Sequence, residues 1–373
     1  MEKYYLAAIQ AVSGIGSQLL QNLIGFFGSG QAVWQAPEGE LLNFQLLPLP
    51  VREKLLQTRR SKPDQPARLQ ESCSKQGIKV CQISDPEYPE LLKEIYSPPL
   101  VLFYRGTLQN HVPRIAVVGA RRVSAYGRTV ADKLAQALAG AGFSVVSGAA
   151  RGVDALSHRG ALAKGRTEAV LGCGVDVAYP PENRKLLEEI AESGAVISEY
   201  TPGCMPVAGN FPARNRIISG MSLGTVVVEA AERSGSLITA QQAMEEGRDV
   251  FAVPGSIFAA SSRGCHRLIQ QGAKLVLNSQ DVIEEYKHLL NRMAGKEKNS
   301  EKFATRAIMS DVESKIMGVL SPDKPLSIDE IIYRLQGQDA AHVAFVLLQL
   351  EFKGFVRADE LQRYTRVMKE DFL

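Results

Sequence analysis

Residues 211–240 read FPARNRIISGMSLGTVVVEAAERSGSLITA, which combines a cationic segment, a Val-rich run and a turn of small residues at 234–236. Continuous Val-rich runs of about 4–8 residues are typical of parallel strands that are covered on both faces. The pattern therefore predicts a helix, a buried strand, a tight turn and a second helix. Because parallel sheets bind ligands at the carboxyl ends of their strands, and helix N-termini favour phosphate, we expect this turn at a phosphate-binding edge.

The composition of the 373-residue chain is typical of a globular protein with two or three domains. The formal net charge is only +3, so a nucleic-acid site would have to be a local cluster of cations. The five cysteines are scattered and form no C-x-x-C pair, which disfavours disulfides or zinc and fits a reducing cytoplasm. The first residues do not resemble a signal peptide, and no run approaches the ~18 apolar residues of a membrane span. We therefore expect a cytoplasmic protein.

Short apolar runs alternate with helical patterns between residues 69 and 290. RIAVVG at 114–119 and FSVVSG at 143–148 are two such runs, and a helical pattern at 128–140 separates them. Strands that alternate with helices of about ten residues predict βαβ units. We therefore expect an α/β core at 69–290, with a Rossmann-like, doubly wound and mostly parallel sheet.

A small helical domain is expected at residues 1–68. The turn Gly14-Ile15-Gly16 joins two of its helices, and it fits either of two structures. One is a helix-hairpin-helix or SAM-like unit whose turn amides grip a nucleic-acid phosphate. The other is a plain helical hairpin, which is favoured because few cations flank the turn.

The other end of the chain predicts a linker and a third domain. Residues 292–299 are polar and aperiodic, as linkers are, so we expect a linker at 291–310, and residues 311–373 predict a winged-helix-like domain. Ser327 and Glu330 have the spacing of a capping box. The third helix of this domain is almost entirely apolar, so contact with a protein, or simple packing, is favoured over recognition of DNA bases.

Glycine-rich strand ends are expected to meet at one edge of the sheet, at 118–121, 147–152, 172–174 and 234–236. Glycine lets a backbone approach a ligand closely, and arginine forks match phosphate oxygens. The nearby arginines predict a cationic strip above the sheet: Arg121, Arg151, Arg214, Arg216 and Arg233. Such a strip is suited to a ligand that carries phosphate.

Two residues of the opening stretch allow alternative roles. Phe211 is either a surface on which bases of single-stranded nucleic acid stack or a core residue. Glu229 is either a catalytic carboxylate that faces a ribose or, as is favoured, an ion-pair partner for Arg214 or Arg216.

Asp154 and His158, one helical turn apart, fit an acid–base pair or a structural role. The structural role is favoured because no nucleophile accompanies them. The sequence has no P-loop, no complete dinucleotide fingerprint, no H-E-x-x-H and no G-x-S-x-G. These absences disfavour P-loop ATP hydrolysis, NAD binding, zinc-protease and serine-hydrolase chemistry.

Several motifs occur in a fixed order between about residues 80 and 285: VVGARRVSAYG, SGAARGVDALSHRGAL, GCGVDVAYPPEN, ISEYTPG, FPARNRIISGMS and GCHRLIQQGA. In this combination the chain resembles the DNA-processing protein A (DprA, or Smf) family. The resemblance implies a protein without catalytic activity, cofactor or metal. Such a protein binds and protects single-stranded DNA and loads the RecA recombinase onto it in natural transformation and recombination. It further implies a homodimer that forms through the core, with single-strand-binding protein as another candidate partner.

The family's DNA contacts, carried over to this sequence, fall on one set of residues: Arg121, Ser147, Gly148, Phe211, Arg214, Asn215, Arg216, Gly235 and Ser236. Arg151 is added to this set of expected DNA-binding residues because of its charge. An alternative interpretation is an enzyme similar to phosphoribohydrolases, whose P-G-G-x-G-T-x-x-E motif places a Glu at the reactive ribose. Here Thr225 precedes Glu229 by a longer spacing, which weakens that interpretation. A third interpretation is a scaffold that works through its winged helix.

Overall fold

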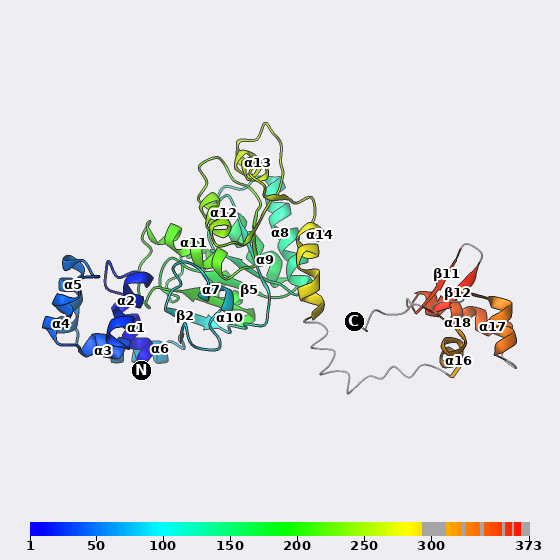
Figure 1. Cartoon of the computed structure of the whole chain (residues 1–373). Helices are drawn as coiled ribbons and strands as arrows, with labels where there is room; N and C mark the ends of the chain where they lie inside the picture. The colour runs from blue at the N-terminus through cyan, green and yellow to red at the C-terminus, as the bar shows by residue number, and fades with distance from the viewer. Residues whose placement is uncertain (293–310, 322–324, 336–338, 353–354, 360–361, 367–373) are drawn as a thin grey trace. The chain divides into compact units, whose positions relative to one another are not determined.

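The structure is a computed structural model that describes residues 1–292, 311–321, 325–335, 339–352, 355–359 and 362–366. The chain divides into two compact units, Met1–Asn291 and Arg292–Leu373 (Figure 1). The first unit contains the sheet and the N-terminal helices. The second contains a small hydrophobic core of its own, which is formed by helices and short strands.

The first unit is built on a nine-stranded sheet. Its strands are β1 (Lys79–Gln82), β2 (Val101–Gly106), β3 (Arg114–Val118), β4 (Ser144–Ser147), β5 (Thr167–Val170), β6 (Ala195–Ser198), β7 (Gly224–Val227), β8 (Asp249–Ala252) and β9 (Lys274–Leu275). Their order is β1-β2-β6-β5-β4-β3-β7-β8-β9. Neighbours are parallel except β1 with β2 and β2 with β6. The predicted mostly parallel, Rossmann-like sheet is confirmed.

Helices cover both faces of this sheet. The helical elements that follow β1 along the chain are α7 (Glu90–Lys93), α8 (Ala125–Gly140), α9 (Val153–Leu162), η1 (Pro181–Asn183), α10 (Arg184–Ser193), α11 (Asn210–Gly220), α12 (Gly235–Glu245), η2 (Ala260–Ser262), α13 (Arg263–Gln270), α14 (Gln280–Ile283) and η3 (Glu284–Tyr286). Within β3, Ile115 and Val117 pack with residues of α8, whereas Ala116 and Val118 pack with residues of α11 and α12. Because successive side chains of a strand point to opposite faces, a strand buried on both sides must be apolar throughout.

The connections place a switch point at β3. The chain continues from β3 through α8 to β4 on one side, and it later returns through α11 to β7 on the other side. Loops that leave the carboxyl ends of β3 and β7 therefore lead away from each other. Open α/β sheets form their ligand crevices at such points.

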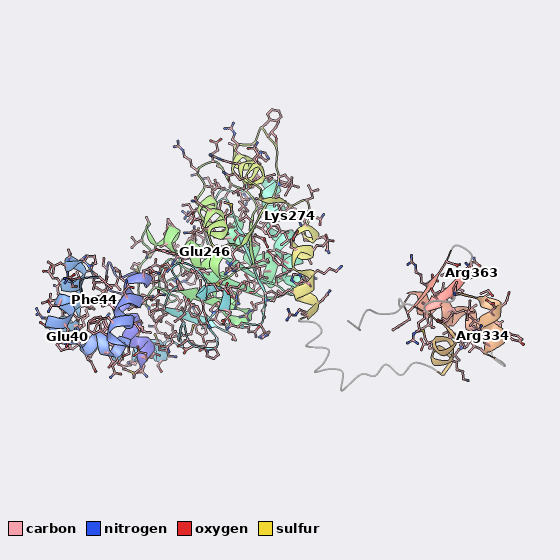
Figure 2. All side chains as sticks on the ribbon, viewed as in Figure 1. Glu40, Phe44, Glu246, Lys274, Arg334 and Arg363 are labelled. Atoms are coloured by element: carbon pink, nitrogen blue, oxygen red, sulfur yellow. The ribbon has the colours of Figure 1, made fainter. Side chains whose placement is uncertain are left out.

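Six helices precede the sheet: α1 (Glu2–Gln10), α2 (Ser17–Phe27), α3 (Gly30–Gln35), α4 (Glu38–Asn43), α5 (Leu49–Ser61) and α6 (Gln65–Lys75). Gly14, in the turn between α1 and α2, has φ +99°, a conformation that favours glycine. Phe44, labelled in Figure 2, packs against Phe26 and Phe27, with ring centroids 5.2 and 5.9 Å apart. The expected boundary at residue 68 falls inside α6, and Lys3 bonds directly to β1, its Nζ donating to Val80 O at 2.7 Å.

The second unit contains α16 (Asp311–Val319), β10 (Leu326–Ser327), α17 (Ile328–Arg334), α18 (Ala340–Phe352), β11 (Val356–Ala358) and β12 (Arg363–Arg366). The strands form an antiparallel sheet in the order β10-β12-β11. The predicted capping box is present, with Ser327 Oγ accepting from Glu330 N and Glu330 accepting from Ser327 N. Most of the expected linker, 293–310, lies outside the described residues. Within the described ranges, no helix is long and apolar enough to cross a bilayer.

Candidate functional site

A groove with a volume of about 820 Å³ lies at the carboxyl ends of β3 and β7. Its walls come from the turn after β3, the turn after β7 and the first turns of α11 and α12. The volume is in the range of ~300–1,000 Å³ that is usual for ligand sites. The groove thus occupies the position at which a doubly wound sheet binds its ligand.

The charge that lines this groove is positive. Arg121, Arg122 and Arg233 are exposed and line it. Within the described part of the chain, none of these three side chains has a hydrogen-bond or ion-pair partner. The carboxylate among the lining residues, Asp154, is buried. Unpaired guanidinium groups around one concave surface favour a polyanionic ligand.

An aromatic surface forms part of the same groove. Phe211, in the first turn of α11, lies with its ring centroid 5.4 Å from that of Tyr179, and the two planes are inclined by 31°. The guanidinium carbon of Arg121 lies 5.8 Å from the Phe211 centroid. Phe211 is half-buried and lines the groove, so it is not a residue of the closed core. Flat rings beside a guanidinium group offer a surface on which a nucleobase can stack.

The start of α12 supplies backbone donors. Ser234, Gly235 and Ser236 line the groove, and the Ser234 side chain accepts from Ser236 N at 3.4 Å. Gly235 has open space around its Cα. Asn215 connects the two helices, because its Nδ2 donates to Gly235 O at 3.5 Å. The first amides and the dipole of an 11-residue helix therefore face the cationic groove.

Arg214 is one of the residues that line the groove, as the predicted strip requires, but its side chain is buried. The residue is 4% exposed. Its Nη1 donates to Gly148 O at 2.9 Å and also to Val170 O. Gly148 must lack a side chain, because a Cβ there would lie 2.5 Å from the guanidinium group. Arg214 therefore holds the turn after β4 at the floor of the groove.

The surroundings of Arg214 are also buried. Burial lowers the pKa of Arg214 and raises the pKa of Asp154, and the attraction between the two groups partly offsets both effects. Asp154 accepts from Ala150 N at 3.3 Å. Ser147 is fully buried, and its Oγ donates to Val117 O at 2.7 Å. Ser147 and Gly148 thus lie below the groove lining rather than in it.

Arg216 faces away from the groove, which corrects the predicted strip at this position. Its Nη1 and Nη2 donate to Glu199 at 2.8 and 2.7 Å, and its Nε donates to Ser97 O at 3.0 Å. Residues two apart on a helix with 3.6 residues per turn lie about 200° apart around its axis. Arg214 and Arg216 consequently cannot line one surface together.

Arg151 is exposed but lies outside the groove lining. It forms a surface ion pair with Glu182, whose pKa is lowered by the hydrogen bond from Arg151. Ion pairs between exposed groups are weak, so Arg151 can exchange this partner for another anion.

Glu229 holds the start of α8. Its carboxylate accepts from Ser124 N at 3.0 Å and from Ser124 Oγ at 2.5 Å, while Ser124 Oγ caps the helix by accepting from Gly127 N at 3.0 Å. The interpretation of Glu229 as a partner of Arg214 or Arg216 is therefore wrong. Glu229 is 3% exposed and does not line the groove, so the geometry does not favour the phosphoribohydrolase-like alternative either.

His158 has structural partners. Its Nδ1 lies 2.7 Å from Thr167 Oγ1, whose hydroxyl lies 2.6 Å from Val145 O and donates to it. The imidazole Nδ1 must therefore be the donor to Thr167. Burial lowers the pKa of His158 to about 3, which keeps the ring neutral. An acid–base pair with Asp154 is not supported by these contacts.

Arg122 and Tyr179 are among the groove residues that sequence reasoning missed. Arg122 is the second arginine of the GARR turn, and its signal was its adjacency to Arg121. Tyr179 comes from the loop after β5, lines the groove and packs against the ring of Phe211. An aromatic residue shortly after the glycine pair of that strand end was the available signal.

Comparisons with known proteins identify similar chains. The model of the family DNA recombination-mediator protein A matches residues 79–287. Protein Smf from Synechocystis sp. is 35% identical over 98% of this chain and 99% of its own length. The X-ray structure of DprA from Streptococcus pneumoniae covers 76% of this chain and 98% of its own, with TM-score 0.68 and 39% identity. A DprA structure from Helicobacter pylori, determined for its single-stranded DNA binding mode, covers 56% of this chain and 96% of its own, with TM-score 0.52 and 30% identity.

Proposed function

The chain belongs to the DNA recombination-mediator protein A family, and from this premise we propose that it binds single-stranded DNA in the groove above β3 and β7. The relative from Helicobacter pylori binds single-stranded DNA. We propose the same ligand here, held by a protein that performs no chemistry on it.

The observation that carries the proposal is that one groove combines aromatic rings with cations that have no polar partner among the described residues. Arg121, Arg122 and Arg233 supply charge for consecutive phosphates, and Phe211 supplies a ring on which a base stacks. Phosphate contacts and stacking carry little base information. Binding should therefore be largely independent of sequence and should weaken as salt concentration rises.

Some of these residues are proposed to touch DNA, and others are proposed to support the residues that do. The residues proposed to touch DNA are Arg121, Arg122, Phe211, Asn215, Arg233, Gly235 and Ser236. Arg151 is proposed to leave Glu182 for a phosphate when DNA is present. We assign Ser147, Gly148 and Arg214 to the support of the turn after β4. Arg216 is not a proposed contact because Glu199 occupies its donors.

We propose that the bound strand is then delivered to a RecA recombinase during recombination, including natural transformation. The support is the family itself, whose members are described as recombination mediators. Such a mediator works on strands that single-strand-binding protein otherwise covers, and we propose a homodimer as the working form. A RecA ATPase assay on DNA coated with single-strand-binding protein tests this step, with a shortened lag expected.

Fluorescence anisotropy with labelled oligo-dT tests the DNA-binding proposal. For single strands the slope of log K against log salt is about −0.7 per phosphate contact. The variant R121A/R122A/R233A should therefore reduce the magnitude of the slope by about 2 between roughly 50 and 200 mM salt. A control with the same change in charge, R159A/K164A/R184A, alters exposed cations that do not line the groove. Equal slopes for wild type and the groove variant would reject the proposal.

A further inference from the structure

A second apolar feature lies at the same edge of the sheet, in the loop 254–262 between β8 and α13. Its adjacent side chains Ile257 and Phe258 are 73% and 90% exposed. Because β8 pairs in parallel with β7, the loop leaves the carboxyl end next to the groove, and Ser261 in this loop lines the groove. In Figure 1 the segment that precedes α13 projects at the top of the view.

The base of this loop is fixed by contacts from two helices. Tyr126 of α8 donates its hydroxyl to Pro254 O at 2.9 Å. His266 of α13 has its Nε2 3.0 Å from Gly255 O. The tip therefore presents its apolar side chains from an anchored segment. An aromatic group that is held in place before binding loses less conformational freedom when a ligand stacks on it.

The charge around the loop matches that of the groove. Arg122 and Arg263 are exposed, and within the described residues neither has a hydrogen-bond or ion-pair partner. The loop sequence, PGSIFAASS, contains no acidic residue. Arg122 lines the groove together with Ser261 of the loop, and Arg263 directly follows the loop in the chain. These cations attract an anion to this edge of the sheet.

This combination decides between two classes of occupant. A second copy of the chain that met this loop through the same surface would bring the unpaired arginines of both copies together, which like-charge repulsion opposes. A single-stranded nucleic acid meets both requirements, because its phosphates pair with the arginines and its bases carry apolar faces. The loop is continuous with the groove, so a nucleic acid that extends past the end of β7 would meet the loop.

We infer that Ile257 and Phe258 form a second base-stacking platform, which holds a nucleotide of the same strand beyond the one on Phe211. The inference rests on the proposed function, since it concerns the path of the DNA after it leaves the groove. It adds a subsite that makes affinity depend on oligonucleotide length.

The test compares full-length variants on two lengths of labelled oligo-dT, about 4 and about 16 nucleotides. Stacking on an aromatic side chain accounts for a loss of about 5- to 140-fold in affinity when the ring is removed. Phe258→Ala should show such a loss on the longer strand and little change on the shorter one. Phe258→Leu should lose as much because it lacks a ring, whereas Phe258→Trp should bind like wild type. Tyr96→Ala is the matched control, because Tyr96 is 81% exposed and does not line the groove.

The outcomes separate this inference from the proposed function. If wild type binds neither oligonucleotide, both fail. If wild type binds, the triple arginine variant loses affinity and F258A binds the longer strand normally, this inference alone fails. Equal losses by F258A on both lengths would also overturn it, because Phe258 would then belong to the first subsite. F258A could also change the mass that sedimentation measures without DNA while its DNA affinity stays at the wild-type value. That result would identify the loop as a contact between copies and would overturn the inference.

Discussion

Arg214→Ala is expected to destabilise the fold, not merely to remove a ligand contact. The guanidinium group donates to the carbonyl oxygens of Gly148 and Val170 and lies close to the buried carboxylate of Asp154. A hydrogen bond from a charged donor contributes about 1.5–3 kcal/mol, and removing one member of a buried charged pair costs about 3–5 kcal/mol. Because these contributions overlap, the free energy of unfolding should fall by about 3–5 kcal/mol.

Urea unfolding of the full chain, followed by far-UV circular dichroism, measures this change through the linear extrapolation. Arg121→Ala is the matched control, since Arg121 is exposed and lacks a polar partner in the described ranges. Its unfolding free energy should stay within about 0.5 kcal/mol of wild type, while its affinity for single-stranded DNA falls. Arg214→Ala with wild-type stability and reduced DNA affinity would refute the supporting role and restore Arg214 as a contact.

Three further predictions concern residues that do not line the groove. His158→Asn should flatten the pH dependence of stability, because the neutral ring is fully favoured above the ordinary pKa of 6.5 and its contribution is lost as pH falls toward about 3. For wild type the loss of unfolding free energy is about 2 kcal/mol at about pH 5, and urea unfolding above pH 6.5 and at about pH 5 measures it. Glu229→Ala should cost about 1–3 kcal/mol of stability and should be non-additive with Ser124→Ala in a double-mutant cycle; additive effects would contradict the shared cap. Arg216→Ala should lower the unfolding temperature but leave DNA affinity within about two-fold of wild type in anisotropy titrations, and a large loss of affinity would show that Arg216 leaves Glu199.

Much of the fold followed from local patterns. The Val-rich runs of β3, β4 and β7 could be identified because a strand covered on both faces must be apolar at every position. The turns after them were expected at one edge because parallel strands share a direction. The first residue of a helix was harder to predict from the sequence. The helical pattern was expected from residue 128, whereas α8 begins at Ala125 with Ser124 as its cap, because capping depends on one side chain and not on periodicity.

Local sequence patterns could not predict in which direction each side chain of the site points. Whether Arg214 faces the groove or the turn below it depends on the packing of α11 against the sheet. The contact between Glu229 and Ser124 joins residues 105 positions apart, and no local pattern announces it. The divergence of Arg214 and Arg216 could have been predicted from helical geometry, since residues two apart cannot share a face.

The most direct test of where DNA binds is photocrosslinking. A short oligo-dT that carries 4-thiothymidine is irradiated with the full-length protein, and the crosslinked peptides are identified by mass spectrometry. We expect crosslinks in the peptides that contain Arg121 and Phe211, and their loss in R121A/R122A/R233A. Crosslinks confined to the N-terminal helices or to the second unit, and unchanged in that variant, would contradict the proposal that the groove above β3 and β7 holds the strand.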